Sequence, residues 1–325
     1  MKKLHCQIIG QELRHYRICD ASAAIAVADG DYFIVANDED NVLRVYRGKT
    51  SGKPHQEIDI NHYFQNNPKN KEVDIEGAAL LDGLVYWITS HGRNKEGKLR
   101  VERRNFLATK IIVVGDNVVI ERVGVAYENL LSDLRENLKD QQLKKYFLGI
   151  DNKQDLAPEA PGGINIEGLS NTQDQELLIG FRNPIPDGKA LLIPLQNPAQ
   201  LVNQNHSTAI FGEPIQLDLG GRGIRSIEYW EKYNLYLICA GASDDGGNFC
   251  LYQWSGNITQ EAQPINFDFP DDFRPESILI DSGHSDRLHI LSDDGGIKQD
   301  GINECKNLPS EQRSFRSIWV EVTPT

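Results

Sequence analysis

One short stretch, Asn165-Ile166-Glu167-Gly168-Leu169, has counterparts along most of the chain. In each copy a polar residue opens a short apolar strand, and a second apolar strand follows after a turn, as in Asp74-Ile75-Glu76-Gly77-Ala78. Further strands complete each unit, and the units recur roughly every 50 residues, which is typical of the blades of a β-propeller. The equivalent positions in the five units are Ser22, Glu76, Glu167, Arg225 and Glu276.

The repeat predicts an all-β protein: a five-bladed β-propeller formed by residues 1–325 as a single domain, with six blades as the alternative. The interval from Glu76 to Glu167 is longer than the others, and its leucines recur at helical spacing. We therefore expect a helical insertion over residues 125–160, between blades 2 and 3. The fifth unit shows only three clear strands, so we expect the N-terminal stretch 5–9 to complete the last blade and close the ring.

Composition excludes several classes of partner. The 325 residues include 34 Lys and Arg against 47 Asp and Glu, which gives a net charge of −13. Such an acidic chain repels phosphate backbones, so we expect no nucleic-acid partner. No stretch approaches the roughly 20 apolar residues that cross a bilayer, so we expect no membrane association. The five cysteines form no Cys-x-x-Cys pair, and we expect all five to be reduced thiols in a cytoplasmic protein.

Antiparallel pairing places the polar residues of the repeat at one end of the ring. The first strand of a blade begins at the end where the second strand finishes. The five repeat positions therefore surround the central channel, close to the residues that end the second strands. We expect a polar basin there, partly covered by the insertion. The second-strand ends contribute His91, Arg182, Asn183 and Asp293.

Three carboxylates in a narrow channel repel one another unless something compensates their charge. In one interpretation Arg225 and water neutralise them, and the ring is a structural plug. In a second, Ca²⁺ or Mg²⁺ binds, although Arg225 already supplies a positive charge to the ring. In a third, a small polar or anionic ligand is held by Arg225 and Arg182, and the glutamates orient it or transfer protons. The predicted metal ligands are Glu76, Glu167, Glu276 and Asp293, and the predicted substrate-binding residues are Arg225, Arg182, Asn183, Glu276 and Ser22.

His91 is the only histidine at the end of a second strand. Histidine transfers protons near neutral pH, so we predict His91 as a catalytic residue together with Glu76 and Glu167. The alternative is that His91 only hydrogen-bonds to the backbone of its loop.

The motifs of the second and third units, with later ones such as Ser292-Asp293-Asp294-Gly295, resemble the bacterial domain-of-unknown-function family 3616. The resemblance includes Asp74-Ile75-Glu76-Gly77 with Thr89-Ser90-His91, and its more specific elements are Arg182-Asn183-Pro184 and Ser292-Asp293-Asp294-Gly295. The resemblance implies one β-propeller and names no substrate. More distantly, the Glu-Gly strand openings are similar to the esterase-like phytase propellers, which implies hydrolysis of phosphate or carboxylic esters.

Two functional hypotheses follow from these residues. The first is a hydrolase that acts on a small anionic ester, phosphoester or lactone. The second is a propeller that binds a ligand or a protein partner at the same face without catalysis. No cofactor is assigned, and Ca²⁺ or Mg²⁺ is left open.

Overall fold

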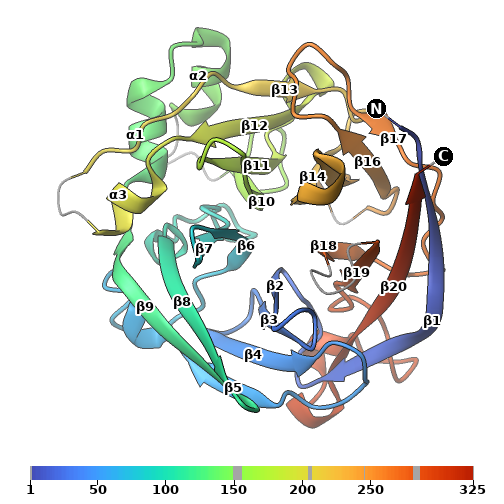
Figure 1. The fold of residues 1–325 in the computed structure, drawn as a ribbon. Helices are drawn as coiled ribbons and strands as arrows, with labels where there is room; N and C mark the ends of the chain where they lie inside the picture. The colour runs from blue at the N-terminus through green and yellow to red at the C-terminus, as the bar shows by residue number, and fades with distance from the viewer. Residues whose placement is uncertain (1, 149–155, 204–206, 245, 281–285, 325) are drawn as a thin grey trace.

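Five four-stranded antiparallel sheets surround a central axis in the computed structural model (Figure 1). The structure describes residues 2–148, 156–203, 207–244, 246–280 and 286–324. In every sheet the strand nearest the axis is the first of its repeat unit, and these inner strands contact one another around the channel. The predicted five-bladed propeller is confirmed, and the six-bladed alternative is wrong.

Blades 1 to 4 are each one continuous segment of chain, with their strands in sequence order from the axis outward. Each of these blades is therefore a β-meander. Blade 1 comprises β2 (Ala23–Val27), β3 (Tyr32–Ala36), β4 (Val42–Arg47) and β5 (Gln56–Asp59); blade 2 comprises β6 (Ile75–Leu81), β7 (Leu84–Thr89), β8 (Phe106–Val114) and β9 (Asn117–Tyr127); blade 3 comprises β10 (Asn165–Asn171), β11 (Leu177–Asn183), β12 (Ala190–Leu195) and β13 (Ile215–Leu217); blade 4 comprises β14 (Gly223–Trp230), β15 (Leu235–Gly241), β16 (Cys250–Trp254) and β17 (Gln263–Pro264).

Blade 5 combines strands from opposite ends of the sequence. Its inner strands are β18 (Pro275–Ile280), β19 (Arg287–Ser292) and β20 (Ser314–Pro324), and its outermost strand is β1 (Leu4–Tyr16). β1 pairs antiparallel with β20. This pairing holds the ring together by cross-strand hydrogen bonds and removes the open edge that β20 would otherwise present.

The core lies between the blades. Every residue of β11 and of β15 is buried, because both faces of each sheet pack against a neighbouring blade. Neighbouring residues of β15 illustrate this: Leu237 joins the apolar cluster shared with blade 5, whereas Ile238 joins the cluster shared with blade 3. Strands buried on both faces are continuous apolar runs, so they lack the alternating pattern of a half-exposed sheet.

The insertion between blades 2 and 3 contains two helices in place of one. α1 (Leu130–Asn137) ends where Leu138 turns to extended backbone, and α2 (Gln141–Phe147) begins at Asp140, whose carboxylate accepts hydrogen bonds from two backbone amides. Both helices lie at the periphery of the ring (Figure 1). Their apolar faces join a core cluster that includes Phe181 of β11. Residues 149–155 of the predicted insertion lie outside the described residues.

The remaining helices are short connections. α3 (Pro198–Asn203) packs against β9. Within the described ranges, no helix combines the length and the apolar character that a membrane span requires. The 3₁₀ turns are Asn61–Tyr63, Val101–Arg103, Pro186–Gly188, Glu231–Tyr233, Cys305–Asn307 and Ser310–Gln312.

The expectation that all five cysteines are reduced is wrong. Cys19 and Cys305 form a disulfide that joins the entry to blade 1 with a loop of blade 5 across 286 residues of sequence. Closure of the ring brings these two distant segments together, which cysteine spacing alone does not reveal. Cys6, Cys239 and Cys250 are free thiols. The cytoplasmic location stays a prediction.

Candidate functional site

A β-bulge places a charged side chain at the channel end of four inner strands. In blade 2, for example, Ile75 pairs with Thr89 and Gly77 pairs with Ile88, so Glu76 is an extra residue without a partner in β7. A bulge redirects its side chain relative to the regular pleat. The same register shift occurs at each of the four charged repeat positions, which are Glu76, Glu167, Arg225 and Glu276.

Glycine follows two of these bulges because the inner strands approach one another closely. A Cβ atom on Gly77 would lie 2.9 Å from the Cβ atom of Leu169 in the next blade. A Cβ atom on Gly168 would lie 2.9 Å from a methyl carbon of Ile224. Such distances are shorter than van der Waals contact, so the Glu-Gly pairs of the repeat combine an inward carboxylate with tight packing around the axis.

The bulged side chains line one cavity of about 250 Å³. All five predicted repeat positions line it, and so do Arg182 and Asp293. Of the insertion, the segment 157–159 contributes to the wall, whereas the two helices do not. Within its described residues, the insertion therefore reaches the cavity only through the segment 157–159. Further lining residues are Asp20, Asp38, Glu39, Asp74, Arg93, Lys95, Arg103, Asn165, Arg274, Gly295, Gly296 and Lys306.

Two arginines hold two of the three glutamates. Arg182 Nη1 donates to Glu167 Oε1 at 2.9 Å, and Arg225 Nη1 donates to Glu276 Oε2 at 2.9 Å. Arg182 also donates to the backbone oxygens of Ala242 and Asp244. Both guanidinium groups are buried and engaged within the protein. Their primary role in this structure is therefore to position carboxylates.

Glu76 makes no hydrogen bond or ion pair with any residue that the structure describes, although it is only 9% exposed. Burial raises its pKa well above the usual range, and the charges of Asp74, Glu167 and Glu276 raise it further. Burial also raises the pKa of Glu276, to about 8, although Arg225 lowers it. The cavity therefore holds carboxyl groups that resist ionisation unless a positive charge enters.

Sequence reasoning missed a second group of carboxyl residues. Asp20 and Asp74 each lie two positions before the repeat position of their unit, and both line the cavity. Burial raises the pKa of Asp20 well above its usual range, and the charge of Asp38 adds to this. Asp74 forms an ion pair with Arg103 at 2.8 Å and accepts a hydrogen bond from Ser90. Neither residue lies in an extended strand, since β2 and β6 begin after them and Asp74 has a φ of 65°, so strand alternation could not place them.

His91 and Asn183 lie outside the cavity lining. The Nδ1 atom of His91 donates to the carbonyl oxygen of Thr89 at 2.8 Å, and its Nε2 atom is buried without a hydrogen-bond partner among the described residues. Burial lowers the pKa of His91 to about 4. The amide of Asn183 donates to the backbone oxygens of Pro158 and Ala160, so it anchors the insertion segment that forms the wall.

Two cations of the lining are unpaired. Arg274 and Lys95 make no side-chain hydrogen bond or ion pair with the residues that the structure describes. Lys95 is exposed and Arg274 is half-buried. Lys95 and Arg274 thus lie in the more exposed part of the lining, and Glu76 lies in its buried part. None of the three side chains is paired with a described residue.

A family model described as a protein of unknown function (DUF3616) matches residues 20–130 and 122–274. The chain belongs to this family. The resemblance found in the sequence is thereby confirmed, and the family description names no activity. No curated protein matches the chain.

Among solved structures, the chain is similar to a PQQ-bound aldose sugar dehydrogenase from Streptomyces coelicolor, with 11% identity, a TM-score of 0.46 and coverage of 99% of each chain. It is also similar to regucalcin, a calcium-binding protein from Agrobacterium tumefaciens, with 8% identity, a TM-score of 0.41 and coverage of 94% of this chain and 92% of the other. Likenesses at this level carry no argument about function.

Proposed function

We propose that the protein is a hydrolase of a small anionic ester, in the class of phosphoesters, carboxylic esters and lactones. One observation supports this proposal: a single cavity contains the carboxyl group of Glu76 and the cations Arg274 and Lys95, and none of the three side chains forms a hydrogen bond or an ion pair with a residue that the structure describes. The cations would attract and hold the anionic part of a substrate. The carboxylate would accept a proton from a water molecule.

The atoms of the reaction balance with water and the substrate alone, and Glu76 acts as the base in those molecules in which its carboxyl group is ionised. The water oxygen bonds to the phosphorus or the acyl carbon while Glu76 takes one proton from the water. The bond to the leaving oxygen then breaks, and Glu76 returns the proton to that oxygen. Asp293, which also lines the cavity, orients the water. Arg182 and Arg225 keep Glu167 and Glu276 in place, and His91 has no role in this scheme.

The first test is a kinetic comparison of the native protein with Glu76→Gln on phosphoester, carboxylic ester and lactone substrates. Removal of the proton acceptor should lower kcat by about 100-fold or more. The matched control is Glu228→Gln, because Glu228 is a channel glutamate that does not line this cavity and borders only a smaller adjoining one. Its turnover should equal that of the native protein.

A second arm addresses substrate binding. Lys95→Ala should raise KM with little change in kcat, whereas Lys98→Ala, an exposed lysine of the same loop outside the cavity, should change neither. Equal turnover in the native protein and Glu76→Gln would remove Glu76 from the mechanism. Ligand binding without turnover on any substrate class would favour the non-catalytic alternative.

A further inference from the structure

Three glutamates from the inner strands of blades 2, 3 and 5 converge at one point of the cavity. Glu76, Glu167 and Glu276 each offer a carboxylate oxygen, and these oxygens all lie within 4.8 Å of one another. All three residues are buried. Carboxylates held this close in a buried site repel one another strongly. This repulsion raises the free energy of the folded protein, and a bound positive charge would remove it.

The hydrogen bonds around the ring leave particular oxygens free. Oε1 of Glu167 accepts from Asn165 Nδ2 at 2.7 Å and from Arg182 Nη1 at 2.9 Å. Its Oε2 atom is buried and accepts no hydrogen bond from the described residues, and Arg225 Nη1 lies 3.5 Å away. The carboxylate of Glu167, only 3% exposed as a residue, therefore has one oxygen fixed by neighbours and one oxygen unoccupied.

Glu76 and Glu276 have different surroundings, and of the three glutamates only Glu167 combines a fixed oxygen with one that accepts no hydrogen bond from the described residues. Both oxygens of Glu76 are without partners among the described residues. Glu276 is oriented by Arg225 Nη1, which lies 3.1 Å from Oε1 and 2.9 Å from Oε2. Outer partners that fix the orientation of carboxylates, while their other oxygens stay free, are the usual surroundings of metal ligands.

We propose that Glu76, Glu167 and Glu276 bind one hard divalent cation, Ca²⁺ or Mg²⁺, with Asn165, Arg182 and Arg225 as positioning residues. The three ligands are all oxygen atoms, which these cations prefer, and each glutamate needs to give only one. Asp293, which the sequence suggested as a fourth ligand, is not part of this oxygen group. Instead its carboxylate accepts a hydrogen bond from the backbone amide of Gly295.

The inference deepens the proposed function, since the cation would lie in the same cavity, but cation binding is measurable without turnover. The experiment is isothermal titration calorimetry of the full chain, freed of metal by a chelator, with CaCl₂ and MgCl₂ in separate runs. One saturable site is expected for at least one of the two cations. Glu76→Gln and Glu167→Gln should each weaken the affinity by about tenfold or more. Glu228→Gln should leave it unchanged, and Asp293→Asn should change it less than either ring variant, because Asp293 acts on Glu276 only through its charge.

Thermal melting of each metal-free variant shows whether it folds, and two ring variants are used so that one unfolded protein does not end the test. Absence of saturable binding by the native chain, or native affinity in both folded ring variants, would overturn the site. Binding without hydrolysis would uphold the cation site and reject the hydrolase. Hydrolysis that persists in chelator, with no cation binding, would uphold the hydrolase and reject the cation site.

Discussion

Arg225 is the residue on which the electrostatics of the ring depend most. It is 5% exposed, lies 2.9 Å from Glu276 and 3.5 Å from Glu167, and stacks over the ring of Phe249. A buried carboxylate that loses its only cation is left with an uncompensated charge, which is far more costly than the loss of an exposed pair. The plug interpretation and the cation interpretation therefore both require Arg225.

Arg225→Ala should lower the free energy of unfolding by about 3–5 kcal/mol, because Glu276 loses its partner. Chemical denaturation of the metal-free protein would measure this change. The double variant Arg225→Ala/Glu276→Gln should recover part of the loss. The control is Arg47→Ala, since Arg47 is exposed and its pair with Asp116 is long, at 3.8 Å. An equally small change in the free energy of unfolding at both arginines would show that the ring does not need the positive charge of Arg225.

The charged repeat positions could be predicted at the residue scale because each occupies the same place in its unit. Asp20 and Asp74 were missed because they were treated as strand openings, although they line the same cavity as Ser22 and Glu76. His91 was misplaced for a different reason. The second strand does end there, but His91 adopts a left-handed backbone with φ of 54° that no sequence pattern reveals. Its imidazole bonds to the preceding loop, as the alternative interpretation stated.

The inner strand is the element that couples the site to the fold. Its bulge supplies the charged side chain, and the glycine that follows in blades 2 and 3 lets the next blade approach. The strands themselves were predictable from apolar runs and turns. The bulges were not, because an extra residue in one strand is defined only by its partner strand.

Gly77→Ala should destabilise the propeller by about 1–3 kcal/mol, because the new methyl group meets the Cβ atom of Leu169 and a methyl carbon of Ile88, each at 2.9 Å. Gly52→Ala is the control, since nothing lies within 4 Å of a Cβ atom at that position. Urea denaturation of both variants measures the difference. Equal urea midpoints for the two variants would mean that the inner strands can move apart at the axis with little loss of stability.

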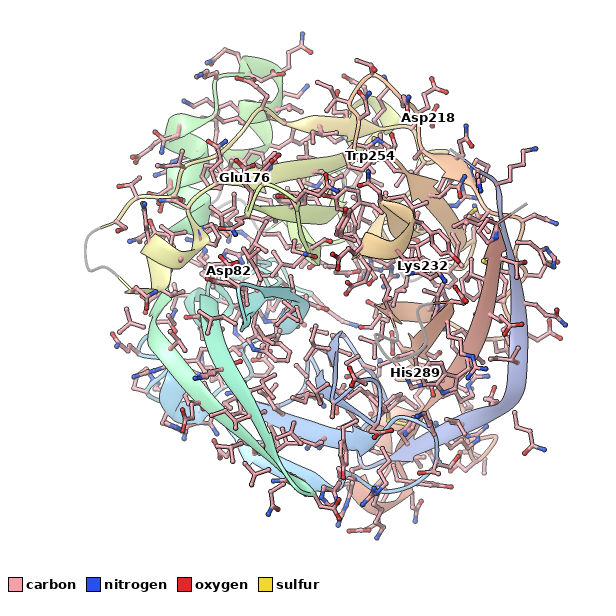
Figure 2. All side chains as sticks on the ribbon, in the orientation of Figure 1. Asp82, Glu176, Asp218, Lys232, Trp254 and His289 are labelled. Atoms are coloured by element: carbon pink, nitrogen blue, oxygen red, sulfur yellow. A yellow bond between two sulfur atoms is a disulfide. The ribbon has the colours of Figure 1, made fainter. Side chains whose placement is uncertain are left out.

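At the scale of the whole molecule, the boundary between blades 1 and 5 is reinforced three times. β1 pairs with β20, the Cys19–Cys305 disulfide crosses the boundary, and a cluster of buried rings fills it. Beside this cluster His15 and His289, the latter labelled in Figure 2, both bond to the hydroxyl of Ser317. The rings of His289 and Phe33 lie 5.0 Å apart. The repeat count implied that such a boundary exists, but neither the disulfide nor the histidine pair has a signature in the sequence.

Replacement of both Cys19 and Cys305 by Ser should lower the free energy of unfolding by about 2–5 kcal/mol, since the disulfide restricts an unfolded loop that spans 286 residues. Dithiothreitol should destabilise the native protein to a similar extent and should not affect the double variant. The control is Cys250→Ser, which alters a free, partly exposed thiol. Insensitivity of the native protein to reductant would show that β1 alone closes the ring.

The buried histidines predict sensitivity to acid. Burial lowers the pKa of His15 to about 3 and that of His289 well below its usual range, so both are neutral when folded. The unfolded chain takes up these protons below about pH 6.5, so stability is present above that pH and is lost as the pH falls toward the folded pKa values. His289→Gln should show a shallower loss of stability between pH 7 and 4.5 than the native protein. His5→Gln, at an exposed position of β1, should follow the native curve.

The bulges have a consequence for engineering. A bulged residue lies outside the cross-strand register, and at these four positions the side chain faces the cavity and lies outside the apolar clusters between the blades. Its chemistry is therefore separable from the pairing that builds the blade. Compensated combinations of new residues at Glu76, Glu167, Arg225 and Glu276 would change what the cavity accepts while the blades stay intact, which makes this ring a natural site for a combinatorial library of receptors.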